Sequence, residues 1–131
     1  AAGVCISAWT DMESTGQSHT TNAESDPSVS KERLLKIAKV YLDGKEPTAP
    51  LASPIHADLT GLPPLLLQVG SIEVLLDDST LLKSRAKAAG VSVEMEVWDD
   101  MPHVWHHYAP ILPEARKAIG RIGEFVLEHT A

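Results

Sequence analysis

Two segments of the chain concentrate the side chains that could perform acid–base chemistry. The first, GSIEVLLDD, contains the carboxylates Glu73, Asp77 and Asp78. The second, DDMPHVWHH, begins at Asp99 and contains His103 with two further histidines. A carboxylate that orients an imidazole and stabilises its protonated form supplies two of the three groups of an acyl-transfer triad. The two segments therefore predict an acid–histidine pair if the fold brings them together.

The three carboxylates of the first segment also have structural interpretations. Asp77 and Asp78 stand where a helix is expected to begin, and an aspartate that caps a helix N-terminus needs no further role. Glu73 precedes that helix, so capping explains it less well. Glu73 is therefore the better candidate for the acid.

Histidines and cysteine also bear on metal binding and on the cellular compartment. The three histidines of the second segment lack carboxylate or cysteine partners at ligand spacing, so no metal site is predicted there. His19, His56 and His129 fall in loop or terminal settings and are expected to be solvated. Cys5 is the only cysteine, which excludes an internal disulfide and favours a reducing, cytoplasmic compartment.

The elements that must position these groups alternate along the chain. Short apolar runs predict strands, and apolar residues at helical spacing predict helices. Alternation of this kind is typical of an α/β fold with a parallel sheet, in which ligands bind beyond the carboxyl ends of the strands. Loops 8–28, 70–77 and 99–112 lie at those ends. The predicted strands are 4–7, 65–69 and 92–98, and the predicted helices are 31–42, 113–128 and one from Asp77 or Asp78 to Ala89.

Local signals refine these elements. Ser30 is a helix N-cap candidate, and Gly44 ends the same helix. Strand 65–69 is continuously apolar, so both of its faces should be covered. Strand 92–98 alternates, which predicts one exposed face or a position at the sheet edge. Segment 45–64 is rich in proline and is expected to be a rigid extended loop.

Composition sets limits on the class of protein. The 131 residues, 44% of them hydrophobic, suffice for about one domain with a buried core. The formal net charge is −7, and no basic face is visible in the sequence, so nucleic acid is not an expected partner. No apolar run approaches the ~18 residues of a membrane span, and the first ten residues lack the basic flank of a signal peptide.

Several motifs together resemble one known family. The segments GLPPLLLQVG at 61–70 and MPHVW at 101–105 closely resemble the hormone-sensitive-lipase family of α/β-hydrolases, the bacterial carboxylesterases. Residues 8–11, Ala-Trp-Thr-Asp, resemble that family's Ser-Pro-Trp-x-Asp segment, with Ala8 where proline is usual. Residues 52–55, Ala-Ser-Pro-Ile, are similar to its Ser-Pro loop. The resemblance extends over essentially the whole chain.

The resemblance implies a carboxylic-ester hydrolase with a small acyl-ester substrate and no cofactor. Glu73 matches the family's catalytic acid, followed by Leu75 in the acidic-x-Leu motif, and His103 matches the catalytic histidine. Asp77 matches a downstream acidic residue that serves the helix start. Candidates for the rim of the substrate pocket are Trp9, Met12, Trp105 and Tyr108, which could equally be packing residues.

The family's nucleophile and oxyanion segments do not occur in these residues. Neither Gly-x-Ser-x-Gly nor His-Gly-Gly is present, and the chain begins at Ala1 without a methionine. The resemblance implies that both segments lie upstream, so that residues 1–131 are the C-terminal segment of a catalytic domain. Ser7 and Ser71 lie near strand ends but in no nucleophile elbow. The isolated chain is therefore expected to be inactive.

Two further interpretations stay open at this stage. The chain could be a non-catalytic truncated module that is competent only for association, because strand 4–7 would present an unpaired apolar edge. It could also belong to a lactone-hydrolysing relative, since the same acid and histidine serve that reaction. By resemblance, a homodimer is expected to form through residues 92–98 and 113–128.

Overall fold

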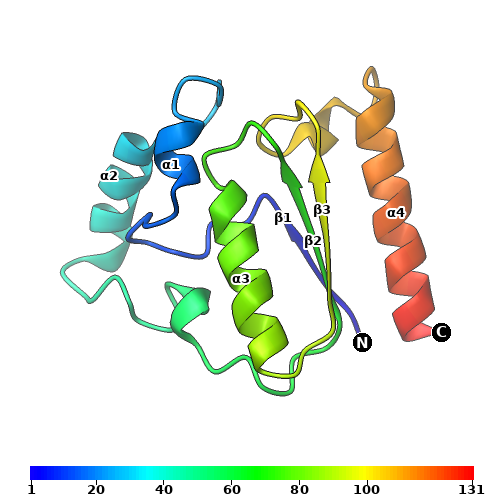
Figure 1. The fold of residues 1–131 in the computed structure, drawn as a ribbon, viewed down its shortest axis with the longest axis horizontal. Coiled ribbons are helices and arrows are strands. Elements are labelled where there is room, and N and C mark those ends of the chain that lie inside the picture. Colours follow the sequence, from blue (N-terminus) through cyan, green and yellow to red (C-terminus); the bar gives the residue numbers. More distant parts are fainter.

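Three parallel strands form the sheet that carries the candidate site (Figure 1). They are β1 (Gly3–Ile6), β2 (Leu65–Gly70) and β3 (Val93–Trp98), in the order β1-β2-β3. The computed structural model describes all residues from 1 to 131. Each strand was predicted to within one residue of its observed ends. Because the strands are parallel and adjacent, the loops that follow them meet at one edge of the sheet.

The central strand β2 is buried along its whole length, as its continuous apolar sequence predicted. Successive side chains point to opposite faces of a strand, so both faces of β2 must be covered. On one face the strand packs against α3 (Leu76–Ala88). The main core lies there and consists of Ile55, Leu59, Leu65, Leu67, Leu82, Ala86, Val91 and Val93.

The other face of the sheet is covered by α4 (Pro113–Thr130), which lies opposite α3 in Figure 1. Its buried residues include Ala115 and Ala118, which pack around Trp105 on the short 3₁₀ helix η2 (Trp105–Tyr108). Gln68 of β2 donates a hydrogen bond from Nε2 to the carbonyl of Ala118 at 3.1 Å. The sheet is thus the middle layer of a three-layer arrangement.

Helix α2 (Lys31–Leu42) was predicted to the residue. The Ser30 side chain accepts a hydrogen bond from the N–H of Arg33, and Gly44 follows with φ +81°. The helix lies beside α1 (Ser18–Thr21), on the side of α3 away from the sheet (Figure 1). Leu34 anchors α2 by packing with two apolar residues of the loop after β2.

Three local expectations are corrected by the structure. Loop 8–28 contains the short helix α1, and segment 45–64 contains the 3₁₀ helix η1 (Pro54–His56). Helix α3 begins at Leu76 with Leu75 as its N-cap residue and no side-chain cap, so neither Asp77 nor Asp78 has the capping role predicted for it.

The two aspartates bind the loop that follows β1 instead. The Asp78 carboxylate accepts hydrogen bonds from the N–H groups of Thr10 and Asp11, at 2.8 and 3.0 Å. Asp77 accepts one from the N–H of Ser18 at 2.8 Å. These contacts span about half of the chain, which is why the local sequence around α3 did not reveal them.

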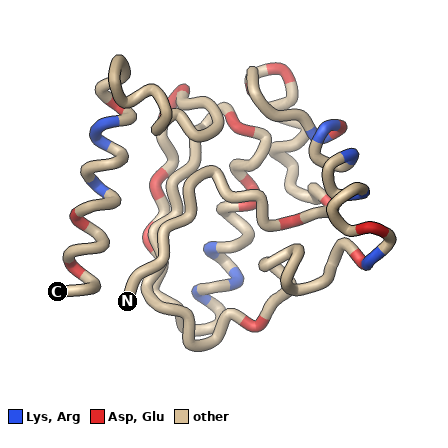
Figure 2. Tube along the Cα trace, turned by 180° about the vertical axis from the view of Figure 1, so that it is seen from behind, with Lys and Arg blue, Asp and Glu red and all other residues tan.

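Charged side chains are distributed unevenly over the elements. All basic residues except Lys45 lie on α2, α3 and α4, whereas acidic residues also occur on β3 and in the loops (Figure 2). Glu96 of β3 forms an ion pair with Arg121 of α4, with 3.0 Å between Oε1 and Nε. None of the helices combines the length and the apolar character that crossing a membrane requires.

Candidate active site

Glu73 and His103 form a hydrogen-bonded pair at the carboxyl edge of the sheet. Oε2 of Glu73 lies 2.9 Å from Nδ1 of His103. The glutamate side chain is completely buried, whereas 30% of the histidine side chain is exposed. An imidazole held through Nδ1 presents Nε2 to a reacting group, which is the orientation that a general base requires.

The second oxygen of the Glu73 carboxylate is also fully engaged. Oε1 accepts one hydrogen bond from the hydroxyl of Ser7 and another from the N–H of Gly70, both at 2.7 Å. Together with His103, three donors surround the carboxylate. Donors of this kind fix the orientation of a carboxylate.

Gly70 allows the turn that carries His103 to approach the end of β2. A Cβ atom at this position would overlap the carbonyl of Met101, so only glycine fits. The same turn is tied to the loop after β2 by a 2.9 Å hydrogen bond from the N–H of Asp100 to Oγ of Ser71. The close approach explains why the acid and the histidine meet without an intervening residue.

The residue after His103 has an unusual backbone conformation. Val104 has φ +49°, a left-handed conformation that β-branched residues rarely adopt. Its N–H donates to Oγ of Ser7 at 3.1 Å, and Ser7 itself has φ +46°. Strained backbone of this type persists only where the surrounding contacts hold it.

The long segment after β1 holds the loop that carries the acid. Asn22 donates from Nδ2 to the carbonyl of Glu73 at 2.8 Å, and the Asp26 carboxylate accepts the N–H of Val74 at 2.9 Å. The Ser18 hydroxyl donates to the carbonyl of Val74 at 2.6 Å. Three polar side chains thus fix the backbone on the C-terminal side of the acid. This segment had been predicted to lie near the site, but its role in holding Glu73 had not.

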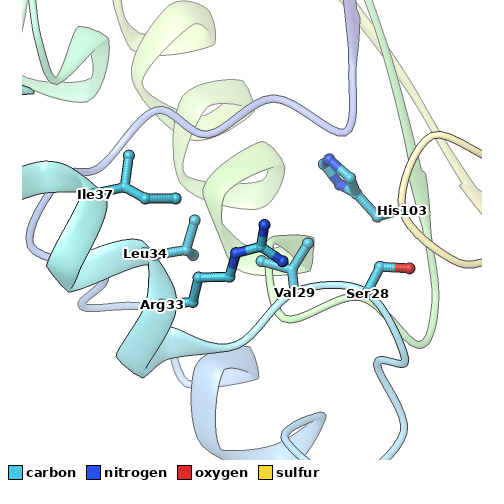
Figure 3. Close-up of a pocket in the computed structure, with 6 residues that line it drawn as sticks. All are labelled: Ser28, Val29, Arg33, Leu34, Ile37 and His103. Carbon is cyan, nitrogen blue, oxygen red and sulfur yellow. The ribbon is translucent and has the colours of Figure 1, made fainter.

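A cavity of about 260 Å³ opens beside His103 (Figure 3). Its wall is formed mainly by one face of α2 and the segment that precedes this helix. The guanidinium group of Arg33 extends from α2 toward the side of the cavity where His103 lies (Figure 3). The lining residues are Ser28, Val29, Arg33, Leu34, Ile37 and His103.

None of the four residues expected at the pocket rim lines the cavity beside His103. Trp105 is fully buried against α4 and contacts Trp98, so its side chain is a core residue and not part of a rim. Trp9 packs beside the cluster that contains Leu34, and its Nε1 donates to a loop carbonyl. Met12 lines a separate cavity beside α2, and Tyr108 is half-exposed on η2.

Sequence reasoning missed the hydrogen bond of Ser7 to Glu73 and the lining residues of α2. Position 7 is the last residue of a predicted strand, so its place at the carboxyl edge was a usable signal. Arg33, Leu34 and Ile37 share one face of a helix by their three- and four-residue spacing.

The other histidines do not join His103. His106 lies on η2, and its Nε2 is 2.8 Å from Oε1 of Gln68 on the buried side of the sheet. Burial lowers the pKa of His106, the nearby charge of Glu73 opposes this effect, and His107 reinforces it. His19 is buried and lies 3.2 Å from the Asp78 carboxylate, so the expectation that it is solvated is wrong.

Two further places in the chain carry side chains that could react or bind a metal. Asp11, Glu13 and His56 offer one metal-ligand atom each within 4.8 Å of one another. Burial would raise the pKa of Asp11, but hydrogen bonds from the Thr15 hydroxyl and from loop N–H groups outweigh it and lower the pKa. These bonds explain the carboxylate as a structural element of its loop.

Burial raises the pKa of the Cys5 thiol on β1. A raised pKa keeps the thiol protonated at neutral pH, and a protonated thiol is a poor nucleophile. The acid–histidine pair is therefore the reactive group that the structure assembles most completely.

A parallel sheet with an acid and a histidine on the loops after two adjacent strands is the arrangement of an α/β-hydrolase. Residues 1–107 match the family described as alpha/beta hydrolase fold, and the chain belongs to this family. The fold class inferred from the sequence is confirmed.

Individual relatives agree with this family. An acetyl-hydrolase from Streptomyces hygroscopicus is 52% identical over 126 residues, which are 96% of this chain and 42% of the relative. An esterase from Acinetobacter venetianus is 37% identical over 123 residues, 93% of this chain and 41% of the relative. A solved esterase from the bacterial hormone-sensitive lipase family is 66% identical with a TM-score of 0.98, covering 99% of this chain and 44% of that one.

These matches confirm the resemblance to the hormone-sensitive-lipase family. The chain spans less than half the length of each of these relatives.

Proposed function

We propose that the full-length gene product containing this chain is a carboxylic-ester hydrolase. The observation that carries the proposal is the 2.9 Å contact between the buried Glu73 carboxylate and Nδ1 of the partly exposed His103. The names of the relatives, an acetyl-hydrolase and two esterases, support the same reaction class.

In this mechanism His103 is the general base and then the general acid. Nε2 takes the proton from an attacking serine hydroxyl and gives it to the leaving alcohol. Glu73 keeps Nδ1 protonated and stabilises the imidazolium that forms between these steps. No Gly-x-Ser-x-Gly segment occurs within residues 1–131, so the proposal assigns the serine to another part of the full-length protein.

The substrate class follows from the cavity beside His103. At about 260 Å³ it is slightly smaller than the usual small-molecule site of about 300–1,000 Å³, and Val29, Leu34 and Ile37 give it an apolar wall. A small acyl group fits this volume. The acetyl-hydrolase relative supports the same size of acyl group.

The proposal is tested by turnover of p-nitrophenyl acetate in the full-length gene product. We expect His103→Ala to lower kcat/KM by about 10⁶-fold, the typical cost of removing the histidine of a triad. His107→Ala is the matched control, because His107 is exposed on the same segment and should leave turnover nearly unchanged. Wild-type turnover in His103→Ala would contradict the proposal.

We further propose a domain assignment, a homodimer and a cellular location for the protein. Residues 1–131 are assigned to the C-terminal segment of a longer catalytic domain, because relatives match over less than half of their own lengths. A homodimer through β3 and α4 would cover half-exposed apolar side chains such as Val97 and Ile119. Light scattering of Val97→Lys against wild type tests that interface.

A cytoplasmic location is inferred from the free Cys5.

A further inference from the structure

We propose that Ser7 is a positioning residue that locks the catalytic acid to the turn carrying the histidine. The inference rests on the proposed function of Glu73 and His103. The Ser7 side chain contacts Glu73 itself and the turn that carries His103. Its Oγ is 2.7 Å from Oε1 of Glu73 and 3.1 Å from the backbone nitrogen of Val104, the residue after His103.

The direction of these hydrogen bonds is determined by chemistry. A backbone N–H can only donate, so the Ser7 hydroxyl accepts from Val104. A hydroxyl has one hydrogen, and here it is donated to Oε1 of Glu73. Oε1 also accepts the N–H of Gly70, so Oε2 remains as the oxygen that receives His103. Ser7 thereby helps to select which carboxylate oxygen faces the histidine.

The same hydroxyl supports the backbone that aims His103. Val104 is held in a left-handed conformation that is unfavourable for a β-branched residue, and its N–H is bound by a residue 97 positions earlier in the chain. Ser7 has a positive φ as well. Two strained residues joined by a hydrogen bond are the kind of constraint found where geometry must be exact for function.

The structure distinguishes this role from that of a nucleophile. Ser7 is only 3% exposed, and its hydrogen bonds go to a carboxylate and a backbone N–H, not to an imidazole. An activated serine instead donates its proton to a neighbouring histidine. Ser7 therefore acts through Glu73 and Val104 and does not attack the substrate.

The test compares Ser7→Ala and Ser7→Gly with wild type in the full-length gene product. Both variants remove the hydroxyl, and Ser7→Gly also removes the cost of a side chain at positive φ. The matched control is Ser14→Ala, because Ser14 is also fully buried at positive φ but its hydroxyl has no hydrogen-bond partner. Circular dichroism establishes that each variant is folded, and Ser7→Gly keeps the test informative if Ser7→Ala does not fold.

Loss of a hydrogen bond to a charged group should lower kcat by about 10- to 100-fold in both Ser7 variants. We expect KM to stay close to the wild-type value, because Ser7 does not line the cavity beside His103. Ser14→Ala should retain wild-type kcat. In a Glu73→Ala background, Ser7→Ala should cause almost no further loss, since Ser7 acts through the acid.

A proton NMR measurement separates this inference from the proposed function. The Nδ1 proton of His103, held by a carboxylate, should give a far-downfield resonance in wild type and in Ser14→Ala. This resonance should move or disappear in both Ser7 variants, whether or not the protein hydrolyses esters. Unchanged kcat and an unchanged resonance in both Ser7 variants would overturn the inference, as would an equal loss in the Glu73→Ala background.

Discussion

Oε2 of Glu73 lies 2.9 Å from Nδ1 of His103 although the two residues are 30 positions apart in the chain, with helix α3 and strand β3 between them. Their meeting follows from the parallel pairing of β2 and β3, which brings the two loops to the same edge. The sheet therefore determines where the two loops meet. Substitutions in either loop should change the local geometry of the pair but not the position of the loops.

The acid assignment predicts different outcomes at Glu73 and Asp77. Glu73→Gln should lower kcat in the full-length protein by about 10⁴-fold, because an amide no longer selects the required histidine tautomer. Asp77→Asn should keep most of the activity, since Asp77 accepts the N–H of Ser18 and does not contact His103. Esterase kinetics of both variants check this expectation. The reverse order of activities would assign the acid to Asp77.

Gly70→Ala should destabilise the fold and separate the two site loops. The new Cβ would overlap the backbone carbonyl of Met101, and overpacking of this kind costs about 1–3 kcal/mol or more. Urea denaturation of the full-length protein measures the change. Gly123→Ala is the control, because Gly123 lies in α4 with open space around it and alanine should stabilise the helix by about 0.5–1 kcal/mol.

Stability should fall below neutral pH because of His106. Its neutral form donates from Nε2 to Gln68, and its Nδ1 is buried without a partner. Burial, opposed by Glu73 and reinforced by His107, lowers its pKa in the folded state, so the unfolded chain takes up a proton first as the pH falls below about 6.5. The free energy of unfolding then decreases, by at most about 1.4 kcal/mol per pH unit.

Denaturation measured between pH 7 and pH 5 checks this sign. His106→Gln, which retains a hydrogen-bond donor, should show a smaller loss of stability over this range than wild type. His107→Gln removes an exposed histidine whose charge is the smallest of the three effects on the His106 pKa, so its slope should stay close to that of wild type. Equal slopes for His106→Gln and wild type would refute the role of His106.

The 131-residue chain on its own should not react covalently with a fluorophosphonate probe. Its buried serine at the site, Ser7, donates to a carboxylate, and no nucleophile elbow occurs in these residues. Intact-mass spectrometry after labelling measures the outcome, with the full-length protein as the positive control. Stoichiometric labelling of the isolated chain would reveal an activated serine within it.

Local signals were sufficient for most of the fold. The Ser30 cap and the apolar spacing after it predicted α2 to the residue, and the continuous apolar run of β2 predicted its burial. The acid and histidine were found from residue type, loop position and family resemblance. These signals lie within a few positions of the element that they define.

Contacts between distant segments could not be predicted in the same way. Asp78 resembles a helix cap in sequence, but its carboxylate binds backbone N–H groups 67 and 68 positions away. His19 is buried because Asp78 lies beside it, and Trp105 is buried because α4 folds back over η2. Ser7 acquires its role only when residues 73 and 104 reach it, and neither distance is visible in the sequence.

The Ser7 hydroxyl binds two residues that lie 66 and 97 positions after it in the chain. Closing loops of this length costs conformational entropy before the new contact contributes favourable free energy. Parallel strand pairing is slow for the same reason. During synthesis, β1 must wait until β2, α3, β3 and the following turn have been made before this junction can form. The Ser7 junction therefore cannot form before the chain has been made as far as Val104, whereas α2 and α3 are built from residues that are close together in the sequence.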